Sequence, residues 1–168
     1  DNQGLITVTG GKLTTFRLIA LDALKLAAPY LGINVDDQRG AIFSPPNSGV
    51  APQGMSAGVF ARLVSRLGIH TRAFLTEMPA AELTPIADTQ VLLAELRWAC
   101  RHEQVVHLDD LLLRRVRLGL LLPRGGIDAV PSLDAILAEE LGWSAEQIAA
   151  ERVRYSDIWQ RYYSLPVA

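Results

Sequence analysis

Strand character is confined to one short segment of the sequence, so the chain cannot build a sheet of its own. Residues 5–9 (LITVT) are rich in β-branched side chains and lie between two glycines. Their continuous apolar run is typical of a strand that is covered on both faces. A lone strand cannot satisfy its own backbone hydrogen-bonding groups, so we expect its neighbouring strands to lie outside this sequence. We therefore expect the chain to be a piece of a longer protein.

The rest of the chain has the three-and-four spacing of apolar residues that predicts helices. Residues 33–54 interrupt this pattern with Pro, Gly, Ser and Asn, which predict a loop. We assign residues 1–32 to a strand, a turn and a helix, residues 33–54 to a linker, and residues 55–168 to a helical domain. The predicted helices cover residues 13–28, 56–67, 70–77, 88 or 89 to 106, 109–121, 132–142 and 144–163. The fold class is thus mainly α.

Composition limits the possible functions. The chain has 168 residues, of which 49% are hydrophobic, and this suits one globular domain with a small appendage. A net charge of −2 argues against a nucleic acid or an anionic membrane surface as the main partner. Cys100 is the single cysteine, so no disulfide forms within the chain. Its apolar helical surroundings predict a buried, inert thiol.

Two apparent motifs do not support a site. His102 and His107 resemble a zinc-protease pair, but they are five residues apart rather than four. Five residues leave two side chains about 140° apart on a helix, so we predict no metal site. Residues 136–155 resemble a DNA-binding helix-turn-helix, but the second helix has no excess of basic residues. We predict an ordinary helical hairpin there and no nucleic-acid partner.

Charged residues on apolar helix faces are more informative. Glu103 shares a stripe with leucines on one predicted helix, and Arg115 shares a stripe with leucines on the next. A buried lone charge costs several kcal/mol, so such groups are normally paired. We predict that Glu103 pairs with Arg115 or with its neighbour Arg114, as a structural clamp between two helices.

The junction TGGKLTTFR lies between the predicted strand and the first predicted helix. We call residues 10–14 the GGK turn. It lacks the spacing of a phosphate-binding P-loop and of a dinucleotide fingerprint. Its glycines let a ligand approach the backbone, and the helix start and Lys12 supply positive charge. These features favour an anion or a carbonyl group, while a tight turn with a solvated lysine remains an equal alternative.

The segment GLITVTGGKLTTFRLIALDALKLA closely resembles the last strand, turn and helix of the flavin domain in FAD-dependent glycerol-3-phosphate dehydrogenases. The block RHE…LDDLLLRRVRLG and the segment GWSAEQIAAERVRYSDIWQRYY resemble the helical C-terminal domain of the same family. Phe16 stands where the family more commonly has Tyr. The resemblance covers essentially the whole chain and identifies it as a C-terminal fragment of such an enzyme.

The resemblance implies an enzyme that oxidises sn-glycerol 3-phosphate to dihydroxyacetone phosphate, with FAD passing electrons to quinone at the inner face of the cytoplasmic membrane. The residues that match the flavin contact of the family are Gly10, Gly11, Lys12, Leu13 and Thr14. Lys12 would lie at the flavin or substrate end of the site. The family's catalytic base and dinucleotide fingerprint belong to an upstream FAD-binding domain, so we expect no catalytic residue here. We expect the fragment alone neither to retain FAD nor to turn over substrate.

Two further interpretations stay open from the sequence. The parent could be a related flavin oxidase that acts on another small hydroxy substrate. Alternatively, the helical domain could be a cap or interaction module of another flavin-dependent oxidoreductase, or a free-standing protein-binding domain. In the parent enzyme itself, the role of the helical domain stays open between bracing the flavin domain, forming a homo-oligomer and presenting the enzyme to the membrane.

Overall fold

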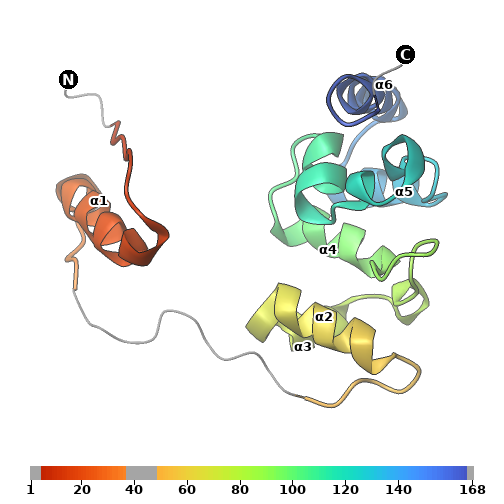
Figure 1. Cartoon of the computed structure of the whole chain (residues 1–168), viewed down its shortest axis with the longest axis horizontal. Coiled ribbons are helices and arrows are strands. Elements are labelled where there is room, and N and C mark those ends of the chain that lie inside the picture. Colours follow the sequence, from red (N-terminus) through yellow and green to blue (C-terminus); the bar gives the residue numbers. More distant parts are fainter. Residues whose placement is uncertain (1–4, 37–48, 166–168) are drawn as a thin grey trace. The chain divides into compact units, whose positions relative to one another are not determined.

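The computed structural model describes residues 5–36 and 49–165. The chain divides into two compact units, Asp1–Ser44 and Pro45–Ala168 (Figure 1). Residues 37–48, which form most of the predicted linker, lie outside the described residues. The domain boundaries at residues 32 and 55 therefore remain predictions.

The first unit contains one long helix. A single 3-10 turn, Leu13–Thr15, leads directly into α1, Phe16–Leu31. The helix ends where Gly32 adopts a left-handed conformation with φ 64°, and the Gly32 amide donates to the carbonyl of Ala28. The predicted helix and its glycine terminator are therefore confirmed, with α1 starting and ending three residues later than expected.

The predicted strand does not form. Residues 5–12 have no regular secondary structure. Within the described residues the β pairing consists of one isolated bridge, between Pro85 and Leu92. A strand exists only through hydrogen bonds to a neighbour, and the described residues provide none for this segment. The expectation of a strand at residues 5–9 is wrong for this chain, whereas the turn and helix that follow are as expected.

The second unit begins with two short helices. α2, Ala57–Leu67, starts at Ser56, whose hydroxyl oxygen accepts a hydrogen bond from the Val59 amide at 3.3 Å. α3, Thr71–Glu77, follows after a 3-10 turn, Gly68–His70. Both helices agree with the sequence expectation.

α4, Leu93–His102, starts later than predicted. The sequence predicts a helix that starts at Asp88 or Thr89, but the Thr89 hydroxyl closes a local turn instead. It donates to the carbonyl of Ile86 at 2.7 Å and accepts from the amide of Val91 at 3.1 Å. The helix start is held by Glu95, whose carboxylate accepts from the Leu92 amide at 2.8 Å.

The predicted helix over residues 109–121 is also replaced. A π-helical turn, Asp110–Arg115, is followed by a 3-10 turn, Leu118–Leu120. Arg117 separates them with a left-handed backbone, φ 59° and ψ 19°. Such a residue cannot continue a right-handed helix, so the apolar periodicity of this segment is shared between two different turns.

Two helices form a hairpin at the C-terminal end of the described chain. α5, Leu133–Leu141, ends at left-handed Gly142, and α6, Ala145–Tyr162, starts at Ser144. The Ser144 hydroxyl oxygen accepts from the Gln147 amide at 3.2 Å, as the capping pattern predicts. Among the described residues, none of the helices combines the length and apolar content that crossing a bilayer requires.

α4 is the centre of the second unit, and it lies between α2 and α3 on one side and α5 and α6 on the other (Figure 1). Seven consecutive residues of α4, from Ala94 to Cys100, are buried. Leu96, Ala99 and Cys100 belong to a large core with the π-helical turn, α5 and α6. Ala94 and Trp98 belong to a smaller core with α2 and α3. The second unit is therefore built around one helix with two apolar cores.

Candidate functional site

The backbone of the GGK turn depends on both of its glycines. Gly10 and Gly11 have φ values of 76° and 97°, a region that side chains rarely adopt. A Cβ atom on Gly11 would lie 2.3 Å from Cδ1 of Ile19, so a larger residue there would also displace the end of that side chain. A Cβ atom on Gly10 would meet no atom within 4 Å. The backbone at Gly10 is thus open to an approaching group.

The helix start beside these glycines is positive and accessible. All five residues of the GGK turn are exposed. Thr15 closes the first turn, because its Oγ1 accepts from the Lys12 amide at 3.3 Å and donates to the Lys12 carbonyl at 2.9 Å. The amides of Leu13 and Thr14 precede the first intrahelical bond and have no helical acceptor. No carboxylate in the described residues pairs with the Lys12 ammonium group.

α1 has apolar side chains exposed around most of its circumference. Leu18, Leu24, Leu26 and Tyr30 are each between 44% and 70% exposed. A surface of this kind is typical of an element that packs against another protein part.

The structure places Glu103 beside Arg115, but the ion pair differs from the prediction. The Glu103 carboxylate accepts two hydrogen bonds of 3.0 Å from Nη2 of Arg66 in α2. Arg115 instead donates through Nε to the backbone carbonyl of Glu103 at 2.7 Å. Arg114 pairs with Asp109 and Asp110. Glu103 is thus held by an arginine, but by one from α2 that the sequence analysis did not consider.

A buried carboxylate that the sequence analysis missed lies next to this cluster. Glu95 is fully buried and accepts a hydrogen bond from Nη1 of Arg62 at 3.1 Å. Arg66 Nη1 lies 3.4 Å from the same carboxylate. A signal was present in the sequence, because Arg62 and Arg66 fall on the apolar stripe of α2 with Val59 and Leu63.

A second cluster joins α4 to α5. Arg97, 9% exposed, donates to Glu82 at 2.7 Å and to Glu139 at 2.8 Å, and it also binds Glu140. The hydrogen bonds that Arg97 donates to these carboxylates, the bonds to Glu82 above all, raise the pKa of Arg97. Arg101 binds Glu140 as well. All of these groups are paired with one another, so we assign the cluster to structure rather than to chemistry.

The two histidines of the apparent zinc motif belong to different elements. His102 is the last residue of α4, and its Nε2 lies 3.7 Å from Glu77. His107 Nδ1 lies 2.9 Å from Glu151 of α6. They do not converge on one point, and the part of the chain that the structure describes contains no group of three potential metal ligands.

Two arginines of the C-terminal hairpin form ion pairs within the fold. Arg152 donates to Asp134 of α5 at 2.6 Å, and Arg154 binds Asp109.

Cys100 is buried in the larger core, and burial raises the pKa of its thiol to about 12. This agrees with the expectation of an inert thiol.

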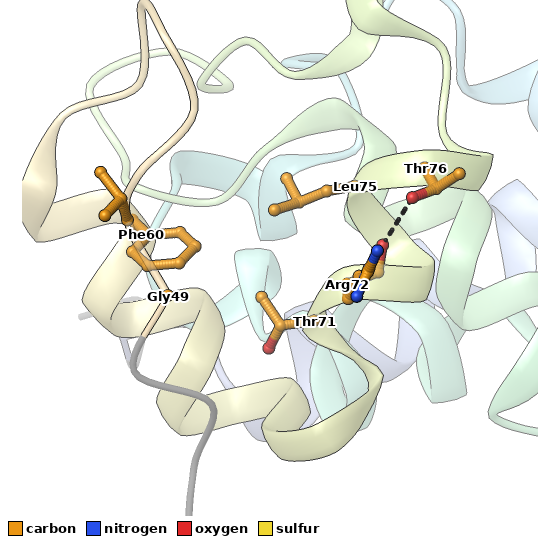
Figure 2. Close-up of a pocket in the computed structure, with 7 residues that line it drawn as sticks. Gly49, Phe60, Thr71, Arg72, Leu75 and Thr76 are labelled. Atoms are coloured by element: carbon orange, nitrogen blue, oxygen red, sulfur yellow. Dashed lines mark hydrogen bonds between the residues drawn. The ribbon is translucent and has the colours of Figure 1, made fainter.

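A small pocket lies between α2 and α3 (Figure 2). It has a volume of about 220 Å³, with Phe60 on one side and Thr71, Arg72 and Leu75 on the other. The Thr71 hydroxyl donates to the Gly68 carbonyl at 2.8 Å, and the Thr76 hydroxyl donates to the Arg72 carbonyl at 2.9 Å. Its hydroxyls are therefore already bonded, and the pocket has no acid, base or nucleophile for a reaction.

Comparison with known proteins places the chain in a family. Residues 22–148 match the family described as the C-terminal domain of alpha-glycerophosphate oxidase. The glycerol-3-phosphate dehydrogenase of Mycobacterium leprae is 30% identical over 91% of this chain and 29% of its own length. Glycerol-3-phosphate dehydrogenase 1 of Mycobacterium bovis is 37% identical over 73% of this chain and 24% of its own length.

A relative that is named an oxidase rather than a dehydrogenase is similar to the same extent. The alpha-glycerophosphate oxidase of Lactococcus lactis is 30% identical over 94% of this chain and 30% of its own length. The chain thus spans less than a third of the length of these relatives. No solved structure matches the chain. Since the family match covers most of the sequence, the chain belongs to the family of the C-terminal domain of alpha-glycerophosphate oxidase.

Proposed function

We propose that this chain is the C-terminal part of an FAD-dependent enzyme that oxidises sn-glycerol 3-phosphate to dihydroxyacetone phosphate. The family match and the names of the relatives support the reaction. The bound FAD supplies the oxidising group. The upstream part of the parent chain binds most of it, and the GGK turn completes its site.

The residues of the GGK turn fit a flavin neighbour. Gly10 leaves open space above its backbone, which a flat ring needs for close approach. The amides of Leu13 and Thr14 have no helical acceptor, and Lys12 has no carboxylate partner among the described residues. A buried flavin would therefore find both space and unused donors at this turn, and this combination carries the proposal.

Each residue of the turn has a distinct role in this proposal. Gly10 and Gly11 set the backbone so that the helix start faces the flavin. The amides of Leu13 and Thr14 stabilise negative charge at the ring edge, as preorganised donors do in many enzymes. Lys12 attracts and orients the anionic substrate through its ammonium group. The catalytic base would come from the upstream domain, so the isolated chain neither turns over substrate nor retains FAD.

The exposed apolar side chains of α1 would pack against the upstream FAD-binding domain in the same chain. We further propose that electrons pass to a quinone, that the parent lies at the inner face of the cytoplasmic membrane, and that it can form a homo-oligomer. An oxidase that passes electrons to dioxygen is the second candidate, because the Lactococcus lactis relative is named an oxidase.

Replacement of Lys12 in the full-length parent tests the proposal. Lys12→Ala should lower kcat/KM for sn-glycerol 3-phosphate by about 100-fold, the loss typical of one preorganised electrostatic contact. The measurement is steady-state turnover with an artificial electron acceptor, so that the result does not depend on the natural acceptor.

Lys25→Ala is the matched control. Lys25 is the chain's other lysine, lies on the exposed surface of α1 and makes only a weak 4.0 Å contact with Asp22. We expect Lys25→Ala to retain wild-type turnover. Equal turnover in the two variants would contradict the proposed role of Lys12 in the site.

A further inference from the structure

A groove of about 690 Å³ in the second unit is lined by five arginines. They come from two places in the chain: α2 contributes Arg62 and Arg66, and the segment from the π-helical turn onward contributes Arg114, Arg115 and Arg117. Five guanidinium groups around one groove repel one another unless anions balance them.

The carboxylates of the fold balance only three of the five. Glu95 and Glu103 bind Arg62 and Arg66, and Asp109 and Asp110 bind Arg114. Arg115 donates a hydrogen bond through its Nε to the Glu103 carbonyl. Within the described ranges, neither Arg115 nor Arg117 pairs with a carboxylate. The groove therefore has two uncompensated positive charges.

Arg117 stands at a position where its side chain is not favoured by the backbone. Its φ of 59° lies in the left-handed region, where glycine would be more stable than a residue with a Cβ atom. Non-glycine residues in this region occur preferentially at functional sites, and the preceding turn is π-helical, which is also more frequent at such sites. This break in the helix places Arg117 in the lining of the groove.

The remaining walls of the groove are apolar. Leu120 and Leu121 are 55% and 60% exposed and lie beside Val116 in the lining. A bare inorganic ion would leave these side chains uncovered. A ligand with an anionic end and an apolar body would contact both kinds of wall.

We propose that this groove binds a phosphate monoester with an apolar body, with the phosphate group between Arg115 and Arg117. The planar fork of a guanidinium group matches two phosphate oxygens, and a phosphate monoester carries nearly two negative charges at pH 7. The apolar body lies along Leu120 and Leu121. The ligand is either a free organic phosphate or the headgroup of an anionic phospholipid. This inference uses residues of the second unit alone and does not depend on the proposed enzymatic function.

The test uses the full 168-residue chain and phenyl phosphate as the soluble probe, with calorimetry as the readout. Arg115→Gln and Arg117→Gly should each weaken binding about 10-fold or more, since a charge-assisted hydrogen bond is lost. Arg117→Gly removes the strain at this position, so its thermal unfolding midpoint should not fall. This second measurement separates a binding role of Arg117 from a structural one.

Arg161→Gln is the control for lost charge, because Arg161 is exposed on α6 and forms no ion pair within the described residues. It should bind the probe as the wild type does. A parallel arm measures binding to phosphatidylcholine vesicles with and without phosphatidic acid. Binding of phenyl phosphate that needs Arg115 and Arg117 supports a free ligand, whereas binding to phosphatidic acid vesicles alone with the same dependence supports a headgroup.

Three outcomes would overturn the inference. Neither probe binds the chain, or both bind equally well to the wild type and to the Arg115 and Arg117 variants, or Arg161→Gln loses as much affinity as they do.

Discussion

Asp109 shows how individual ion pairs stabilise this fold. Its side chain is buried, and the carboxylate binds Arg154 of α6 and Arg114 of the π-helical turn. Burial alone would raise the pKa of Asp109, but the hydrogen bonds from Arg154 and Arg114 hold its pKa below the usual value. The ionised Asp109 carboxylate is therefore more stable in the native state than in the unfolded chain.

This shift has a definite sign in the pH dependence of stability. A carboxylate with a lowered folded pKa stabilises the fold fully above its unfolded pKa, about 3.9, and loses that contribution as pH falls through the folded pKa. Asp109→Asn should lower the free energy of unfolding by about 2 kcal/mol at pH 7. This value already allows for the weaker attraction that follows from the solvent exposure of Arg114 and Arg154. The difference from wild type should shrink below pH 4.

Urea denaturation at pH 7 and pH 3 measures both quantities. Asp157→Asn on the exposed surface of α6 is the control and should change stability little at either pH. An Asp109→Asn deficit that is the same at pH 7 and pH 3 would show that charge has no part in it.

At the residue scale, the apolar stripe identifies Glu103 as a charge that needs a partner, but it identifies neither that partner nor the buried charges Glu95, Arg97 and Asp109. The structure provides a partner for Glu103. The partner, Arg66, is 37 residues away in the chain and lies on a helix that packs against α4 only in the folded unit. Helical periodicity places a residue on a face but does not say which helix that face meets.

At the scale of elements, α6 packs against two glycine-containing turns. The Tyr155 hydroxyl donates to the Gly125 carbonyl at 2.6 Å, and the Trp159 indole donates to the Gly119 carbonyl at 2.8 Å. A Cβ atom on Gly119 would lie 2.4 Å from the Tyr155 hydroxyl oxygen and 2.7 Å from Leu113. Gly119 is therefore required by close approach rather than by its backbone angles.

Gly119→Ala should destabilise the fold by about 1–3 kcal/mol through overpacking. Gly58→Ala is its matched counterpart, because Gly58 lies in α2 and a Cβ atom there would meet nothing within 4 Å. That change should raise stability by about 0.5 kcal/mol, since alanine has the higher helix propensity. Thermal unfolding of both variants is the measurement, and a Gly119→Ala variant as stable as wild type would contradict the packing argument.

The boundaries of the elements could be predicted where a local residue determines them. Ser56, Ser144, Gly32 and Gly142 mark helix ends by capping or by left-handed backbone, and each was found in its expected place. The start of α4 and the break at Arg117 were not predicted. The start of α4 is set by the local turn that the Thr89 hydroxyl closes, and the break at Arg117 is set by a left-handed backbone that a residue with a Cβ atom does not favour.

At the scale of the whole chain, the two units differ in how much apolar surface they bury. The second unit has two cores around α4. In the first unit, most of the large apolar side chains of α1 are exposed, and residues 5–9 have strand-like composition without strand structure. This contrast supports the proposal that the first unit completes a flavin domain whose main part lies upstream in the parent.

The most direct test compares two glycines at opposite ends of the first helical segment. Gly10 and Gly32 both have left-handed backbones, and a Cβ atom on either would meet nothing within 4 Å. Alanine therefore introduces a positive-φ backbone penalty at both positions and no clash with described residues. Only Gly10 belongs to the turn that we propose lies against the flavin.

The measurement is the affinity of the full-length parent for FAD, by fluorescence titration after removal of the native cofactor. Gly10→Ala should weaken FAD binding about 10-fold, because a methyl group would press against the ring. Gly32→Ala should bind FAD as the wild type does. Equal affinity in all three proteins would contradict the proposal that the GGK turn contacts the flavin.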